Sequence, residues 1–155
     1  MTNRHRGGCQ CALIAFRSPC ARKLIVVQPP EDAIETGTAT IWLEDGIIFE
    51  RFKGAPATSE STTKVFDVIR DLCEGSPRPF LLDARIWWGG AQEAWGTAVK
   101  ELTSTFSAVA MLVEPEVAAK IGPFPDSINR LLIPFQVFTD EAEALAFVRS
   151  FLPSE

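Results

Sequence analysis

The chain has 155 residues, of which 46% are hydrophobic and 23% are charged, and its formal net charge is −5. This length and composition predict one folded domain with a single core and disfavour global disorder. No run approaches the ~18 consecutive apolar residues that a membrane span requires, so we expect no membrane contact. The acidic balance also disfavours nucleic acid as a partner, because affinity for nucleic acid depends on neutralising phosphates.

Residues 1–22 are interpreted as a basic, disordered leader that precedes the fold. The leader holds three of the four cysteines and the single histidine: Cys9, Cys11, Cys20 and His5. Their spacing lacks the paired C-x-x-C pattern of zinc modules, so we expect no metal site, with metal or polyanion binding by the leader as alternatives. Nothing indicates a disulfide framework, which is typical of a cytoplasmic protein. Residues 23–34 are expected to form an edge strand or a linker, and residues 35–153 the folded domain.

A β-hairpin is the clearest local pattern after the linker. The β-rich segments Thr38–Glu44 and Ile47–Lys53 are joined by Asp45-Gly46, a pair that suits a two-residue type I′ turn because both positions need positive φ. Trp42 lies on one face of the first strand together with two threonines. If that face is exposed, Trp42 marks an interface, and core packing is the alternative.

Helices and strands alternate after the hairpin. Thr58 or Ser59 is expected to cap the first helix, whose apolar face includes Cys73 as a small core residue. The later elements are the strand Pro79–Ile86, the helix Ala91–Thr105, the strand Ser107–Val113, short helical pieces at Glu116–Ile121 and Asp126–Leu132, the strand Pro134–Phe138, and a last helix capped by Thr139 or Asp140. This order predicts an α/β fold with a mixed sheet that opens with a hairpin and continues with mostly parallel strands.

The segment at the end of the strand Pro79–Ile86 carries the candidate binding site. Open α/β sheets place their ligand crevices at the carboxyl ends of strands. Two adjacent tryptophans there are hard to bury together, and two glycines at the start of a helix leave backbone N–H groups free to receive an anion. The alternative is structural: the acid pairs with the arginine, one tryptophan joins the core, and the glycines make the turn. The candidate binding residues are Asp83, Arg85, Trp87, Trp88, Gly89 and Gly90.

Signatures of catalysis and of cofactor binding are missing from the sequence. A Ser-His-Asp triad lacks its base, because the one histidine lies in the leader. The chain has neither a Walker motif nor a G-x-G-x-x-G loop, and no pair of acids stands out among the others. We therefore expect a protein that is not an enzyme and needs no cofactor. An enzyme whose site is assembled only by folding is the least favoured alternative.

Four segments carry a family resemblance: WLEDGIIFERFK, PFLLDARI, SAVAMLVE and IPFQVFTDEAEALAFVRSF. Together they resemble the STAS domain of bacterial anti-sigma-factor antagonists, and more closely the uncharacterised SpoIIAA-like bacterial proteins. The resemblance covers about Glu35–Leu152 and implies an α/β fold and a role in protein interaction or regulation. Antagonists of this family carry a phosphorylatable Ser or Thr at the start of their second helix, whereas the corresponding junction here reads WWGGAQ. The phosphoswitch of the family is therefore not expected in this chain.

Two hypotheses for the function follow from these patterns. The first is a non-enzymatic STAS-like interaction or regulatory module that binds an unknown protein partner and forms a homodimer. The alternative is a small-molecule or lipid-binding module that uses a crevice at Trp87–Gly90. Because a fold does not determine an activity, the choice depends on the geometry of the site.

Overall fold

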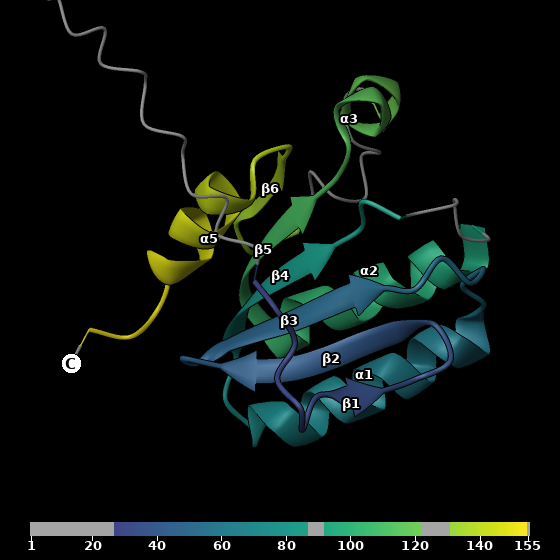
Figure 1. Cartoon of the computed structure of the whole chain (residues 1–155). Helices are drawn as coiled ribbons and strands as arrows, with labels where there is room; N and C mark the ends of the chain where they lie inside the picture. Colours follow the sequence, from purple (N-terminus) through teal and green to yellow (C-terminus); the bar gives the residue numbers. More distant parts are fainter. Residues whose placement is uncertain (1–26, 87–91, 122–130, 155) are drawn as a thin grey trace, which may run out of the picture.

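The structure, a computed structural model, describes residues 27–86, 92–121 and 131–154. Within these ranges the strands form one mixed sheet of six in the order β1-β2-β3-β4-β5-β6 (Figure 1). Their bounds are β1 Ile34–Glu35, β2 Ala39–Glu44, β3 Ile47–Phe52, β4 Arg78–Asp83, β5 Phe106–Leu112 and β6 Phe135–Phe138. β1, β2 and β3 pair antiparallel, and β4, β5 and β6 then continue parallel to β3. This arrangement confirms the predicted fold class.

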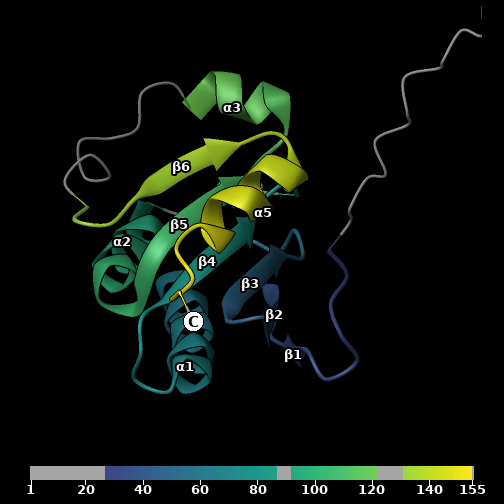
Figure 2. The ribbon, with the colours of Figure 1, turned by 90° about the vertical axis from the view of Figure 1, so that its left-hand side faces the viewer.

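Helices cover both faces of the sheet. The helices are α1 Ser59–Cys73, α2 Gln92–Thr105, α3 Pro115–Ile121 and α5 Glu141–Arg149. α1 and α2 lie side by side on one face, α5 lies against β4, β5 and β6 on the other, and α3 lies beyond the end of β5 (Figures 1 and 2). None of the helices in the described ranges is both long and apolar enough to span a membrane.

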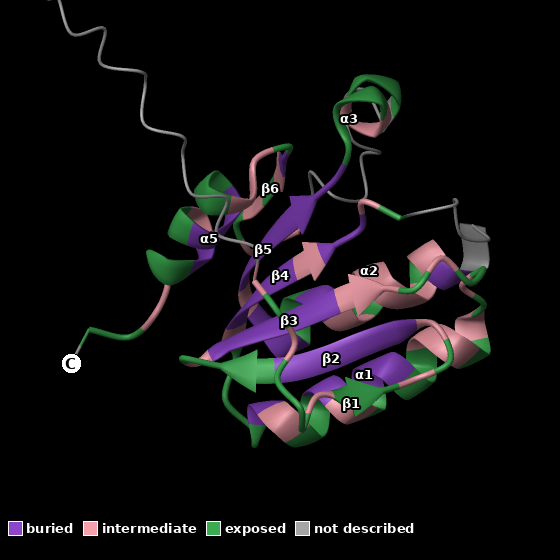
Figure 3. Cartoon of the chain, viewed as in Figure 1, coloured by how far each residue is buried: buried purple, intermediate pink, exposed green. Residues whose placement is uncertain are grey.

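Most residues of the central strands β3, β4 and β5 are buried (Figure 3). Because side chains alternate along a strand, Phe80 of β4 joins the core under α1 and α2, whereas its neighbour Leu81 joins the core under α5. The rings of Phe80 and Phe106 stack with their centres 4.1 Å apart. This double burial confirms the cover on both faces that the apolar run of β4 predicts.

Local signals set the boundaries of the elements. Asp45 and Gly46 both have positive φ, at 50° and 80°, so the turn between β2 and β3 has the predicted conformation. The Thr58 side chain accepts a hydrogen bond from the Ser61 backbone N–H and caps α1. Asp140 caps α5 in the same way through the Glu143 N–H. Cys73 is buried at the end of α1, as predicted.

Most other boundaries differ from the prediction by one residue at most, and three differences are informative. β4 ends at Asp83 and not at Ile86. Phe106, between the predicted helix Ala91–Thr105 and the predicted strand Ser107–Val113, continues the apolar pattern of that helix in the sequence. In the structure it begins β5, because it pairs with Arg78 of β4 and its ring stacks on Phe80. Residues 131 and 132 are not helical, and the rest of the helical piece predicted at 126–132 lies outside the described residues. Residues 1–22, and residues 23–26 of the segment predicted as an edge strand or linker at 23–34, also lie outside the described residues.

Candidate functional site

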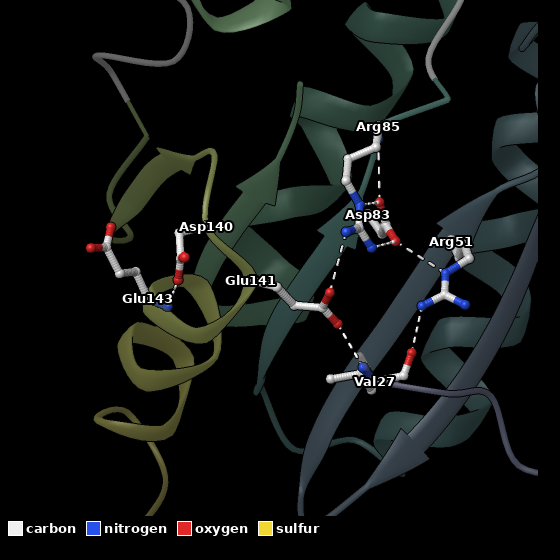
Figure 4. Close-up of polar contacts among 7 residues, drawn as sticks. All are labelled: Val27, Arg51, Asp83, Arg85, Asp140, Glu141 and Glu143. Carbon is white, nitrogen blue, oxygen red and sulfur yellow. Dashed lines mark hydrogen bonds and ion pairs between the residues drawn. The ribbon is translucent and has the colours of Figure 1, made fainter. Parts of the chain in front are cut away.

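Asp83 and Arg85, two of the predicted binding residues, pair with each other at the end of β4 (Figure 4). The Asp83 carboxylate accepts hydrogen bonds of 2.9 and 2.7 Å from the Arg85 guanidinium and one of 3.0 Å from Nε of Arg51. Arg85 also forms an ion pair of 3.2 Å with Glu141 at the start of α5. Glu141 accepts a 2.6 Å hydrogen bond from the Val27 N–H, and the Val27 carbonyl accepts one of 2.5 Å from Arg51. The network therefore joins β3, β4, α5 and the segment before β1.

The charges of this network satisfy one another. Burial opposes ionisation of Asp83, but the hydrogen bonds and charge of Arg85, together with the charge of Arg51, outweigh it and lower the pKa of the carboxyl. The hydrogen bond to Asp83 is also the main reason why the pKa of Arg85 is raised. A carboxylate held by two guanidinium groups has little capacity left for a ligand. This geometry agrees with the structural alternative for Asp83 and Arg85, and a binding role for them stays a prediction.

The other predicted site residues divide into two groups. Trp87, Trp88, Gly89 and Gly90 lie outside the described residues. Trp42 is only 4% exposed, its ring stacks on Phe49 at 5.1 Å, and the Arg51 guanidinium lies 5.7 Å from the ring centre. The burial of Trp42 agrees with core packing, which is the alternative to an interface.

A cavity lies on the opposite face of the sheet from this network. Arg51 and Asp83 are paired in register, and so are Glu50 and Leu82, the residues that precede them. Because side chains alternate along a strand, those of Glu50 and Leu82 point to the opposite face, which α1 and α2 cover. A partly open cavity of about 100 Å³ lies there between the sheet and the two helices. We call it the Glu50 pocket. Apart from Glu50, residues that line it include Val65, Phe66, Ala98, Phe80, Leu82 and Met111.

Glu50 is the one ionisable residue among the described residues that line this pocket. Only 6% of it is exposed, and its carboxyl has neither a hydrogen bond nor an ion pair with any described residue. Burial raises the pKa of the Glu50 carboxyl to about 8. At neutral pH the group is therefore mainly protonated and neutral. Its O–H group can donate one hydrogen bond, and no described residue accepts it.

The pocket was not predicted from the sequence, although a weak signal for it exists. Ile48, Glu50 and Phe52 alternate in one strand and share a face, so a single acid lies between two apolar side chains. The same pattern also suits a strand whose acid faces solvent at an edge. Only the pairing of β3 with β4 and the cover by α1 and α2 bury the carboxyl.

The chemistry of the pocket favours binding. A protonated carboxyl in an apolar cavity can donate a hydrogen bond to a bound molecule, while the surrounding side chains bury its apolar part. The other lining side chains with a hydrogen-bonding group are Thr38, Thr62 and Trp95, so no second acid, base or charge lies beside Glu50 in the described part of the pocket. The described residues also contain no group of three or more His, Cys, Asp or Glu side chains that could hold a metal ion.

The sheet order and the helices define an α/β domain with a SpoIIAA-like fold. The structure is similar to that of an uncharacterised protein of the DUF3478 family from Shewanella loihica PV-4, which has a SpoIIAA-like fold. The TM-score is 0.55 at 16% sequence identity, over 71% of this chain and 91% of that one. Residues 41–152 match DUF7793, a domain of unknown function, and the chain belongs to that family. No curated protein matches the chain.

Proposed function

We propose that this chain is a non-enzymatic SpoIIAA-like module that binds a small molecule in the Glu50 pocket. The observation that carries the proposal is a carboxyl that is almost fully buried and has no partner among the described residues, in the wall of an apolar cavity. An unpaired polar group costs free energy when it is buried, so a ligand that hydrogen-bonds to it gains stability from that bond as well as from apolar contact.

The composition of the lining supports binding over catalysis. General acid–base chemistry at a bound substrate usually needs a second group, either a nucleophile held by a base or an acid and a base of different pKa. Glu50 is accompanied by two threonines and by Trp95, whose indole N–H is only a donor, and otherwise by apolar side chains. The proposal therefore keeps the non-enzymatic character expected from the sequence, but uses a different pocket from the crevice predicted at residues 87–90.

A fragment screen read by methyl NMR tests the proposal. Compact apolar molecules that carry one polar group are added to the full chain, and Met111 and Leu82 report binding in the pocket. Leu145, on the buried face of α5 at the other side of the sheet, is the internal control. We expect fragments that shift the first two methyl signals and leave Leu145 unchanged, and that are recovered chemically intact.

A variant that fills the pocket provides the matched control. Ala98→Leu adds volume from α2 and should abolish these shifts, whereas Ala144→Ser, on the buried face of α5, should leave them in place. If every fragment bound elsewhere, or bound Ala98→Leu equally well, the proposed function would be wrong. The protein partner and the homodimer expected from the sequence stay predictions, and native mass measurement of the intact chain tests the homodimer.

A further inference from the structure

The Glu50 pocket holds enough information to define the class of its ligand. We propose, on the basis of the function proposed above, that it binds a compact, uncharged molecule with an apolar body of about four to five carbon atoms and one hydrogen-bond acceptor, such as a ketone or amide oxygen. In this complex the Glu50 carboxyl donates its proton to the acceptor in a hydrogen bond, and no proton is transferred.

The size of the proposed ligand follows from the volume of the cavity. A dry cavity of about 150 Å³ lined by apolar side chains holds a benzene molecule. The Glu50 pocket measures about 100 Å³ and is lined in the same way, by residues such as Val65, Phe80 and Met111. A body of about four to five carbons therefore fills it, and any larger part of the molecule has to extend through the open side.

The residues around Glu50 indicate that the ligand carries no charge. An anionic ligand such as a fatty acid would place a second acid beside Glu50 with no basic side chain among the described lining residues to balance it. A cationic amine would require both its own charge and that of Glu50 to leave water, which costs several kcal/mol per ion in a buried site. A neutral acceptor avoids both costs, because Glu50 is already uncharged in its desolvated position.

Three probes of nearly the same shape distinguish these classes: cyclopentanone, cyclopentylammonium and cyclopentanecarboxylate. Each is titrated into the full chain, and dissociation constants are taken from the Met111 and Leu82 methyl shifts. Cyclopentanone should bind most tightly. Its dissociation constant should rise about tenfold between pH 6.5 and pH 9, because only the protonated carboxyl can donate. No other titratable or charged side chain lines the described pocket from α1, α2 or the strands.

Two substitutions of the same residue separate the donor from the charge. Glu50→Gln keeps a donor of similar shape and should bind cyclopentanone within about threefold of the natural chain, without the pH dependence. Glu50→Leu keeps the volume but removes the donor and should weaken binding roughly five- to tenfold. Both variants are first checked for the natural pattern of methyl signals under α5.

The outcomes separate this inference from the proposed function. Cyclopentylammonium could instead bind more tightly than cyclopentanone, with an affinity that rises from pH 6.5 to pH 9 and is lost in Glu50→Gln. That result would overturn the proposed ligand class but would leave the pocket as a binding site. Tighter binding of the carboxylate would do the same. If none of the three probes moved the Met111 or Leu82 signals, both the inference and the proposed function would fail.

Discussion

Replacing Glu50 by Gln should change the pH dependence of stability in a way that few other single substitutions would. In the folded chain burial raises the pKa of Glu50 to about 8, from an ordinary value of 4.5 that applies once the chain unfolds. Between these two values the folded chain holds a proton that the unfolded chain has released. The free energy of unfolding therefore falls as the pH rises through this window.

The size of the effect follows from the shift. One pKa unit corresponds to about 1.4 kcal/mol, so a carboxyl that titrates near pH 8 in place of pH 4.5 lowers the stability by roughly 5 kcal/mol at most across the window. Glutamine does not titrate, so Glu50→Gln lacks this loss. Relative to the natural chain, the variant should gain about 3–5 kcal/mol between pH 5 and pH 8.5. Any cost of burying the amide is the same at both pH values and cancels in the comparison.

Urea unfolding followed by circular dichroism at pH 5 and pH 8.5 measures this gain. The control is Glu44→Gln, which replaces an exposed glutamate at the end of the adjacent strand β2. If the difference between the natural chain and Glu50→Gln changed by less than about 1 kcal/mol between the two pH values, the carboxyl would not be desolvated, and the reasoning behind the pocket would be refuted.

Three further substitutions test the frame around the pocket, each measured by urea unfolding at pH 7. Asp83→Asn should cost about 2–3 kcal/mol, because it leaves Arg51 and Arg85 without their shared carboxylate, and the loss should shrink at low pH as Asp83 itself becomes protonated; an unchanged midpoint would show that the network contributes nothing. Phe80→Ala should cost about 3–5 kcal/mol, since it removes a ring buried between β4 and the helices, and a cost below 1 kcal/mol would contradict that packing. Gly46→Ala should cost about 1–2 kcal/mol, because φ there is +80°, and a neutral result would contradict the turn.

Much of the fold could be predicted from the sequence because its signals are local. The Asp45-Gly46 pair needs a turn with positive φ at both positions, and Thr58 and Asp140 cap helices through their own side chains. Phe106 illustrates the limit of this approach. Its place in a helical apolar pattern is overridden by pairing with a strand about 28 positions away in the chain, which no local pattern encodes.

The candidate site is harder to predict for the same physical reason. Asp83 and Arg85 are two residues apart at the end of one strand, so the sequence alone offers their pairing as an alternative to ligand binding. Their partners Arg51 and Glu141 come from distant segments, and no local pattern points to them. Glu50 escapes prediction because its burial depends on β4 and on two helices that follow it, whereas its own sequence neighbours also suit a solvent-facing acid.

A carbon-13 NMR titration of the Glu50 side-chain carboxyl tests the central claim most directly, with Glu50→Gln used to assign the signal. We expect a midpoint near pH 8 in the free chain, and a higher midpoint when cyclopentanone is bound, because a neutral acceptor stabilises the protonated form. A midpoint near 4.5 that does not move with the ketone would contradict the account, since it would mean that Glu50 is hydrated or paired and takes no part in binding.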